Sequence, residues 1–227
     1  MPVTPPPVSS DSPDAPEATR RARGRPRKTL DERDDGNRRQ ALLQAAAHLF
    51  RQQGFAGTST RDIAAAAGMQ AGSPFYHFEN KQALLAGVML EGMQRAVEHQ
   101  RQALAQADAD GHGLDAHQRL RVLVRAHFDV LLGPKSDFVP VMLYEWRSLS
   151  AEQRAEVNRL RTAYEAAWLP VLKALHASGA LRGDPGLARL LIFGALNWSA
   201  QWFDARGRAT LDELTDTALQ LFLRDAA

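Results

Sequence analysis

Helical periodicity without competing strand signals is the feature that most constrains the fold of this chain. From Asn37 onward, apolar residues recur at helical spacing, as they do over about 38–53, where Leu42, Ala45, Ala46, Leu49 and Phe50 fall on one face. Runs of β-branched residues, which are typical of strands, are missing. A chain of 227 residues is long enough to bury a core, so the sequence predicts an all-α protein.

Start and stop signals place the remaining helices. Ser59-x-x-Asp62 resembles a capping box before a short helix that Gly68 ends. Pro170 is expected to kink a long helix over about 150–178 near its middle. Three more start signals are Ser150-x-x-Gln153, Thr210-x-x-Glu213 and Asp184-Pro185. We expect a third short helix after Met69, followed by helices at about 80–108, 116–132, 139–147, 150–178, 184–203 and 210–224.

Positive charge is concentrated near the N-terminus. Residues 20–28, with the sequence RRARGRPRK, hold six basic residues and no acid, whereas residues 86–227 carry a net charge of −1. Residues 1–36 contain seven of the 12 prolines and almost no bulky apolar residue, which predicts a disordered basic arm. Charge gathered at one end indicates a polyanionic partner, and nucleic acid is the commonest one.

The arm contains a short pattern that is typical of minor-groove contacts. In RGRPRK, the proline keeps the chain extended, so Arg23, Arg25 and Arg27 are positioned to enter a narrow A·T groove. The alternative is a charged tail that is merely solvated.

Composition also limits the chemistry that the chain can carry out. Cysteine is absent, which excludes disulfides and thiolate metal sites and favours a reducing cytoplasm. The N-terminus lacks the apolar run of a secretory signal. No Glu-x-x-His pair, metal-ligand cluster or nucleophile motif is present, so we expect no cofactor and no metal, and an enzyme is the less favoured class.

Residues 63–78 have the pattern of a helix-turn-helix. Ala64 is small where two helices must touch, Gly68 supplies the turn, and Ile63, Ala67 and Met69 provide apolar contacts. The second helix is then expected to direct polar side chains outward, while Phe75 and Phe78 face or flank the core. A protein-binding module with a basic face is the alternative to DNA binding.

Each outward residue has a plausible chemistry towards DNA. We expect Thr60 and Arg61 to reach phosphates near a helix N-terminus, and His77 and Lys81 suit flanking phosphates. We expect Gln70 and Ser73 to exchange hydrogen bonds with base edges and Ala71 to touch a thymine methyl group. Tyr76 stacks or donates a hydrogen bond.

From about Arg38 to Leu85 the chain resembles the TetR-type bacterial transcriptional repressors. The pieces GFAGTSTRDIAAAAGM, G-S and YHF-x-N-K-x-x-LL are close to the family pattern in type and spacing. Two positions depart from it. Pro74 replaces a usual leucine and is expected near the fourth position of the short helix, facing the core. Phe75 replaces a usual tyrosine and lacks the hydroxyl that would contact a phosphate, a role that Tyr76 partly takes over.

The resemblance implies how the whole chain is organised. Residues 37–82 correspond to a helix-turn-helix DNA-binding domain. Residues 83–227 correspond to a ligand-binding body, and its last two helices form the interface of a homodimer. The segments YEWRSLSAEQRAEVNRLRTAYEA and GALNWSAQWF resemble the branch that responds to lipid-like or CoA-linked effectors. The implied pocket walls are Trp146, Tyr164, Trp168, Phe193 and Trp198.

Three function classes follow from these observations. The favoured class is a dimeric repressor that a small apolar or CoA-linked effector releases from a pseudo-palindromic operator. The second is an architectural protein that binds A·T-rich DNA through the arm alone, and the third is a helical enzyme.

Overall fold

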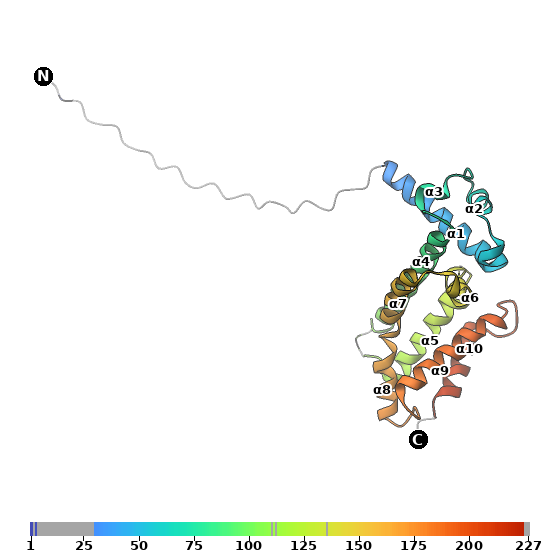
Figure 1. Cartoon of the computed structure of the whole chain (residues 1–227). Coiled ribbons are helices and arrows are strands. Elements are labelled where there is room, and N and C mark those ends of the chain that lie inside the picture. The colour runs from blue at the N-terminus through green and yellow to red at the C-terminus, as the bar shows by residue number, and fades with distance from the viewer. Residues whose placement is uncertain (2, 4–29, 110, 112, 135, 225–227) are drawn as a thin grey trace.

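The computed structural model describes residues 1, 3, 30–109, 111, 113–134 and 136–224. No strand forms within these ranges, and the prediction of an all-α fold is confirmed. The elements, shown in Figure 1, are α1 (Leu30–Gly57), α2 (Thr60–Ala66), α3 (Pro74–His77), α4 (Lys81–Ala107), α5 (Ala116–Leu132), α6 (Phe138–Glu145), η1 (Trp146–Ser148), α7 (Ala151–Glu165), α8 (Trp168–Ala177), α9 (Pro185–Trp198), η2 (Ser199–Gln201) and α10 (Leu211–Phe222).

Helices α1, α2 and α3 form a head at one end of the molecule, at the top of Figure 1. Leu42, Leu43 and Phe50 of α1 are buried against Ile63 of α2, as the apolar periodicity predicts. The same core includes Leu84 of α4, so the fourth helix completes the head.

Helix α1 begins earlier than predicted. It starts at Leu30, so the expectation of a disordered arm is wrong for residues 30–36. Arg38 Nη2 lies 2.9 Å from Asp34 Oδ2, one turn away, and such pairs support an exposed helix. Gly54, with φ 73°, breaks the helical path close to the predicted end, and one further turn reaches Gly57.

The turn between α2 and α3 follows the sequence signals with one difference. Ser59 and Asp62 form the predicted capping box, and hydrogen bonds from Ser59 lower the pKa of the Asp62 carboxyl. Gly68 has φ 69°, which suits a glycine at the end of α2. Pro74 is buried as predicted, but it is the first residue of α3 rather than the fourth. At that position a missing N–H forfeits no helical hydrogen bond.

Helix α4 connects the head to the body. Its buried residues face α1 at one end and α5, α6 and α7 further along. A side chain at Gly92 would place its Cβ 2.8 Å from Phe138 Cβ, so this glycine permits the close approach of α6.

The expected helix over 150–178 is two helices. Residues 166–167 separate α7 from α8, and both keep αR dihedral angles, so the chain bends here as predicted while the run of helical hydrogen bonds is interrupted. Pro170 accounts for the break, because it cannot donate to the carbonyl of Ala166 and its ring clashes with that group. Gln100 of α4 bridges the break: its Nε2 donates to Tyr164 O at 3.0 Å, and its Oε1 accepts from Trp168 Nε1 at 2.8 Å.

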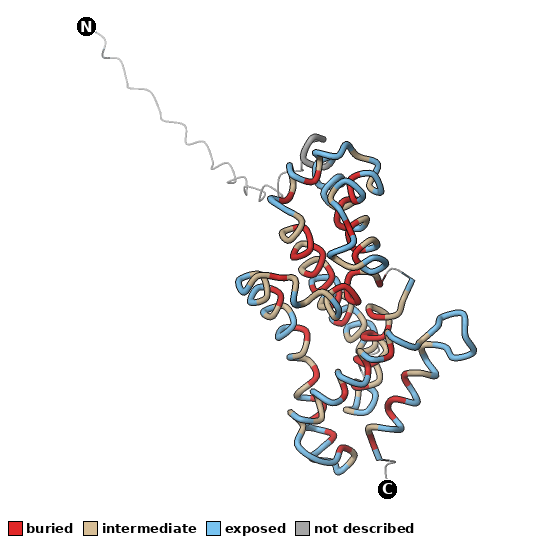
Figure 2. Tube along the Cα trace, turned by 45° about the vertical axis from the view of Figure 1, so that its right-hand side comes forward, coloured by how far each residue is buried: buried red, intermediate tan, exposed pale blue. Residues whose placement is uncertain are grey.

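Helices α9 and α10 leave an apolar surface uncovered. The tube in Figure 2 shows exposed residues along the outer sides of the C-terminal helices. The large apolar side chains that are more than half exposed in this region are Leu187, Leu190, Leu191, Trp198, Trp202 and Leu221. We refer to these six residues as the α9–α10 face.

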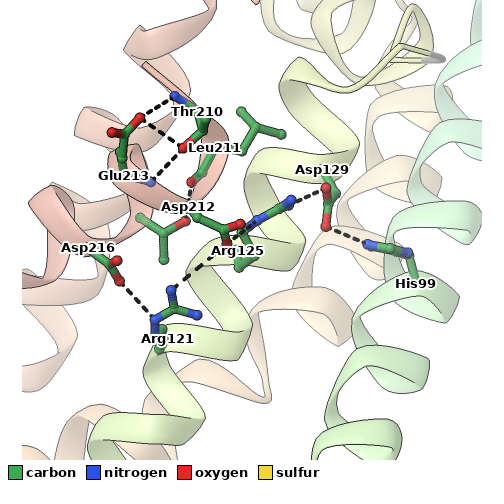
Figure 3. A network of polar contacts seen from close by, with 10 residues as sticks. His99, Arg121, Arg125, Asp129, Thr210, Leu211, Asp212, Glu213 and Asp216 are labelled. Carbon is green, nitrogen blue, oxygen red and sulfur yellow. Dashed lines mark hydrogen bonds and ion pairs between the residues drawn. The ribbon is translucent and has the colours of Figure 1, made fainter. Parts of the chain in front are cut away.

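Charged side chains fix α10 on α5 and α5 on α4, as Figure 3 shows. Arg121 Nε lies 2.8 Å from Asp216 Oδ1, and Arg125 Nε lies 2.9 Å from Asp212 Oδ1. Arg125 also pairs with Asp129, which in turn lies 3.4 Å from His99 Nε2. Acids and bases therefore alternate across the three helices.

Candidate nucleic-acid interface and ligand cavity

The start of α2 and the turn before α3 present the polar residues that the sequence assigned to DNA. Arg61, Gln70 and Ala71 are exposed, whereas Thr60 and Ser73 are half-buried. Gln70, Ala71 and Ser73 precede α3 instead of lying on it, because Pro74 sets its first turn. Tyr76 lies on α3 itself, is 79% exposed and is free to reach outward.

Two predicted orientations on α3 are wrong. His77 does not point outward: its side chain is only 6% exposed, and Nδ1 lies 3.8 Å from Asp35 Oδ1 of α1. Phe75 does not face the core, because it is 57% exposed. The exposed apolar group on this surface is therefore Phe75, while His77 packs between helices.

Lys81 holds the head together instead of presenting its ammonium group outward as predicted. Its Nζ donates to Phe55 O and to Thr58 O, both at 2.8 Å. It also lies 4.4 Å from the centroid of the Phe55 ring. These contacts join the first residue of α4 to the last turn of α1 and to the residue that follows it.

The predicted minor-groove arginines Arg23, Arg25 and Arg27 lie outside the described residues. Their contact with DNA stays a prediction.

A cavity of about 530 Å³ lies in the body, between α4, α5, α6, α7 and α9. It contains three of the five predicted wall residues, Trp146, Tyr164 and Phe193. Its other apolar lining includes Met93, Ala96, Val130, Val139, Met142, Leu143 and Leu190. Because apolar groups predominate, the space suits a greasy ligand.

The remaining two predicted wall residues lie elsewhere. Trp168 is fully buried in a core cluster of the body with Leu120, Phe128 and Leu172, and it does not line the cavity. Trp198 is 66% exposed on the α9–α10 face. Trp168 nevertheless packs directly behind the cavity wall, because its ring centroid lies 4.6 Å from that of Phe193.

Polar residues that the sequence did not single out also line the cavity. His127 Nδ1 lies 3.0 Å from Tyr164 Oη, and His127 Nε2 lies 3.1 Å from Asn197 Oδ1. Burial lowers the pKa of His127 to about 4 and raises that of Tyr164, so both side chains are neutral near pH 7. In the sequence, His127 is a lone histidine within the apolar stretch RVLVRAHFDVLL, which carries no recognisable ligand pattern.

Charged residues line another part of the cavity. Arg189 forms an ion pair with Glu165, and Arg161 Nε lies 3.6 Å from Glu165 Oε1. The Arg161 guanidinium also lies 5.8 Å from the centroid of the Trp146 ring. Two cations share one carboxylate here, which leaves a positive charge beside the apolar space.

The segment α6–η1 connects this cavity to the head. Glu145 Oε1 accepts from Phe55 N at 2.8 Å, directly after the break at Gly54. At the other end of α6, Asp137 Oδ1 lies 2.8 Å from Arg51 Nη1. The next residue after Glu145 is Trp146, which lines the cavity, so the two sites are one residue apart along the chain.

None of the helices in the described residues combines the length and apolarity needed to cross a membrane. The His, Asp and Glu side chains of these residues form no group of three that would hold a metal ion.

Comparison with known proteins agrees with this arrangement. HTH-type transcriptional repressor KstR2 of Rhodococcus jostii (strain RHA1) is 29% identical over 191 residues, covering 82% of this chain and 89% of that protein. The crystal structure of AibR in complex with isovaleryl coenzyme A and operator DNA has a TM-score of 0.72 and 26% identity, covering 82% of this chain and 97% of that chain. The crystal structure of superantigen PfiT, whose description names a different activity, has a TM-score of 0.68 and 40% identity, covering 83% and 97%.

Family models match both parts of the chain. Residues 42–88 match the bacterial regulatory proteins of the tetR family, and residues 113–226 match the tetracyclin repressor-like C-terminal domain. The first match contains the helix-turn-helix, and the second contains most of the residues that line the cavity. The chain therefore belongs to the TetR family of transcriptional regulators.

Proposed function

We propose that this chain is a dimeric repressor that leaves a pseudo-palindromic operator when a small apolar or CoA-linked ligand enters the body. Residues 37–82 would bind DNA, residues 83–227 would bind ligand and the second copy, and the protein would act in the cytoplasm. AibR, described in complex with isovaleryl coenzyme A and operator DNA, is a precedent for both partners.

The observation that carries the proposal is the position of α6–η1. Val139, Met142 and Trp146 of this segment line the cavity, while Glu145 and Asp137 bond to α1 of the head. A ligand that displaces the segment would therefore change the placement of the head, and the DNA-bound state would lose population. A regulatory role explains these contacts better than a catalytic one.

For the DNA interface we propose roles by exposure and chemistry. Arg61 and Thr60 would bind phosphates at the start of α2, and Gln70 and Ser73 would bind base edges. Ala71 would contact a thymine methyl group, and Tyr76 would stack or donate a hydrogen bond. His77 and Lys81 are left out because their side chains are held within the head.

The basic arm would strengthen binding without adding much sequence choice. Arg23, Arg25 and Arg27 match the chemistry of a narrow A·T minor groove. An architectural protein would depend on this arm alone, so deletion of residues 1–29 separates the two ideas. We expect the truncated chain to bind its operator more weakly but still selectively, whereas an architectural protein would lose all binding.

The proposal is tested with DNA from just upstream of the coding region and with an unrelated duplex, at several salt concentrations. We expect clear preference for the upstream duplex. Arg61→Ala should weaken binding to both duplexes and flatten the salt dependence, because it removes a phosphate contact. Gln70→Ala should instead cost about 1–3 kcal/mol at particular base pairs.

Two results would contradict these assignments. If both substitutions are neutral, the DNA-facing surface has been placed wrongly. If the wild-type chain binds both duplexes equally at every salt concentration, random-sequence selection must recover a preferred site for the repressor proposal to survive.

A further inference from the structure

Three hydrogen-bonded side chains interrupt the apolar wall of the cavity. His127 of α5 lies between Tyr164 of α7 and Asn197 of α9, at 3.0 Å and 3.1 Å. Aromatic rings surround the imidazole, with the centroid of Phe193 at 5.4 Å and that of Trp168 at 6.0 Å. All three members of the trio line the cavity.

A neutral imidazole has one donor and one acceptor, so the trio has two possible hydrogen-bond patterns. In the first, Tyr164 donates to Nδ1 and Nε2–H donates to the Asn197 carbonyl. In the second, Nδ1–H donates to Tyr164 and the Asn197 amide, turned over, donates to Nε2. The tautomer of His127 therefore decides which of its two partners donates a hydrogen bond and which accepts one.

Each pattern leaves hydrogen-bonding capacity that the trio does not use. The first leaves the Asn197 NH₂ as a donor and a lone pair of Tyr164 Oη as an acceptor. The second leaves the Asn197 carbonyl as an acceptor and the Tyr164 hydroxyl as a donor. Within the part of the chain that the structure describes, the second polar atom of the Asn197 amide makes no hydrogen bond.

We propose that the His127–Tyr164–Asn197 trio binds a hydroxyl or carbonyl oxygen on the apolar portion of the ligand. The cavity would then select an oxygenated chain or ring over a plain hydrocarbon one. This inference rests on the proposed function, because it names the chemistry of the ligand that the same cavity takes.

The electrostatic character of the cavity supports a neutral group at this point. Burial keeps His127 uncharged, with a pKa of about 4, so the trio offers no cation to an anionic head group. The positive charge of the cavity lies instead with Arg161 and Arg189, which share Glu165. An acidic or phosphorylated head is suited to those arginines, and an oxygen within the apolar portion is suited to the trio.

The test compares hexadecanoyl-CoA and hexadecanoic acid with their monohydroxy and mono-oxo derivatives, oxygenated at successive chain positions. Dissociation constants are measured by calorimetry with the full-length protein. We expect at least one derivative to bind about tenfold more tightly than its parent, the effect of one well-formed hydrogen bond.

The variants Tyr164→Phe and Asn197→Leu should each reduce that ratio towards one, because each removes a polar group of the trio. Tyr144→Phe is the matched control, because Tyr144 lies on α6 outside the cavity and should leave the ratio unchanged. Thermal unfolding of each variant confirms that it is folded.

The possible failures are distinguishable. If the parents and all derivatives bind equally, or if the ratio survives both substitutions, the trio does not recognise oxygen and the inference is wrong, while the cavity still binds ligand. If no compound binds in either the acid or the CoA series, the proposed lipid-like effector is wrong as well.

Discussion

The ionisation of the buried His127 imidazole affects the stability of the folded state. Burial lowers its pKa from 6.5 to about 4, so the folded protein binds fewer protons than the unfolded chain between these pH values. Stability contributed by the neutral imidazole is therefore fully present above about pH 6.5 and is lost as the pH falls towards 4.

Acidification from about pH 7 to about pH 5 should cost the wild-type chain about 2 kcal/mol more than it costs His127→Gln, which has no imidazole to protonate. The free energy of unfolding, measured in urea across this range, gives the comparison. His117→Gln, at an exposed position of α5, serves as the control and should follow the wild-type slope. Parallel profiles for wild type and His127→Gln would show that the pKa of His127 is not lowered.

Local signals near each residue could be read from the sequence, whereas long-range contacts could not. The capping boxes at Ser59, Ser150 and Thr210 formed as predicted, because a cap depends on residues three positions apart. His77 contacts Asp35, and Lys81 contacts Phe55 and Thr58. Only folding brings these residues together, so the sequence did not reveal that both side chains are held within the head.

At the scale of elements, α6–η1 is a short segment with contacts on both sides. It contributes Trp146 to the cavity and Glu145 to the head, where the Glu145 carboxylate accepts the Phe55 N–H after the Gly54 break. That amide has lost the regular helical path, so the carboxylate supplies a partner that the helix does not.

Removal of this carboxylate should loosen the joint between head and body. In Glu145→Ala the amide hydrogen of Phe55 should exchange about tenfold faster or more, because a hydrogen bond to a charged group contributes about 1.5–3 kcal/mol. Hydrogen exchange followed by NMR measures this rate. Glu156→Ala, at an exposed position of α7, is the matched control and should leave the rate unchanged. Unaltered exchange in Glu145→Ala would show that this hydrogen bond does not hold the head to the body.

Helix boundaries could be predicted where composition and caps agreed. The predictions failed where tertiary contacts determine the boundary. The range expected for the fifth helix, 116–132, is the range observed. The kink expected from Pro170 lies at residues 166–167, between α7 and α8, whereas sequence alone does not show that Gln100 bonds to groups on both sides of it.

We expect a second copy of the chain to bind at the α9–α10 face. Leu191 is 74% exposed and Leu187 is 63% exposed, and neither contributes to the core clusters of the single chain. Their burial in a two-fold interface would count twice, because each residue occurs in both copies. Ligand-linked movement of the heads also requires such an interface.

Leu191→Glu should therefore weaken dimerisation by at least about a hundredfold, since two leucine contacts of about 1.5–3 kcal/mol are lost and charge is buried. Sedimentation over a range of concentrations detects the shift to monomer. Gln106→Glu, which adds the same charge at an exposed site on α4, should remain dimeric. A Leu191→Glu protein that stays fully dimeric would place the interface elsewhere.

In the proposed mechanism the cavity and the DNA surface are coupled, so ligand and operator must each weaken the binding of the other. The measurement is the dissociation constant of the tightest-binding acyl-CoA, determined with the free protein and with the protein saturated by its operator. Because coupling is reciprocal, the account predicts that operator DNA weakens ligand binding by about 5- to 150-fold, the same factor by which the ligand weakens operator binding. Equal ligand affinity with and without operator would contradict it.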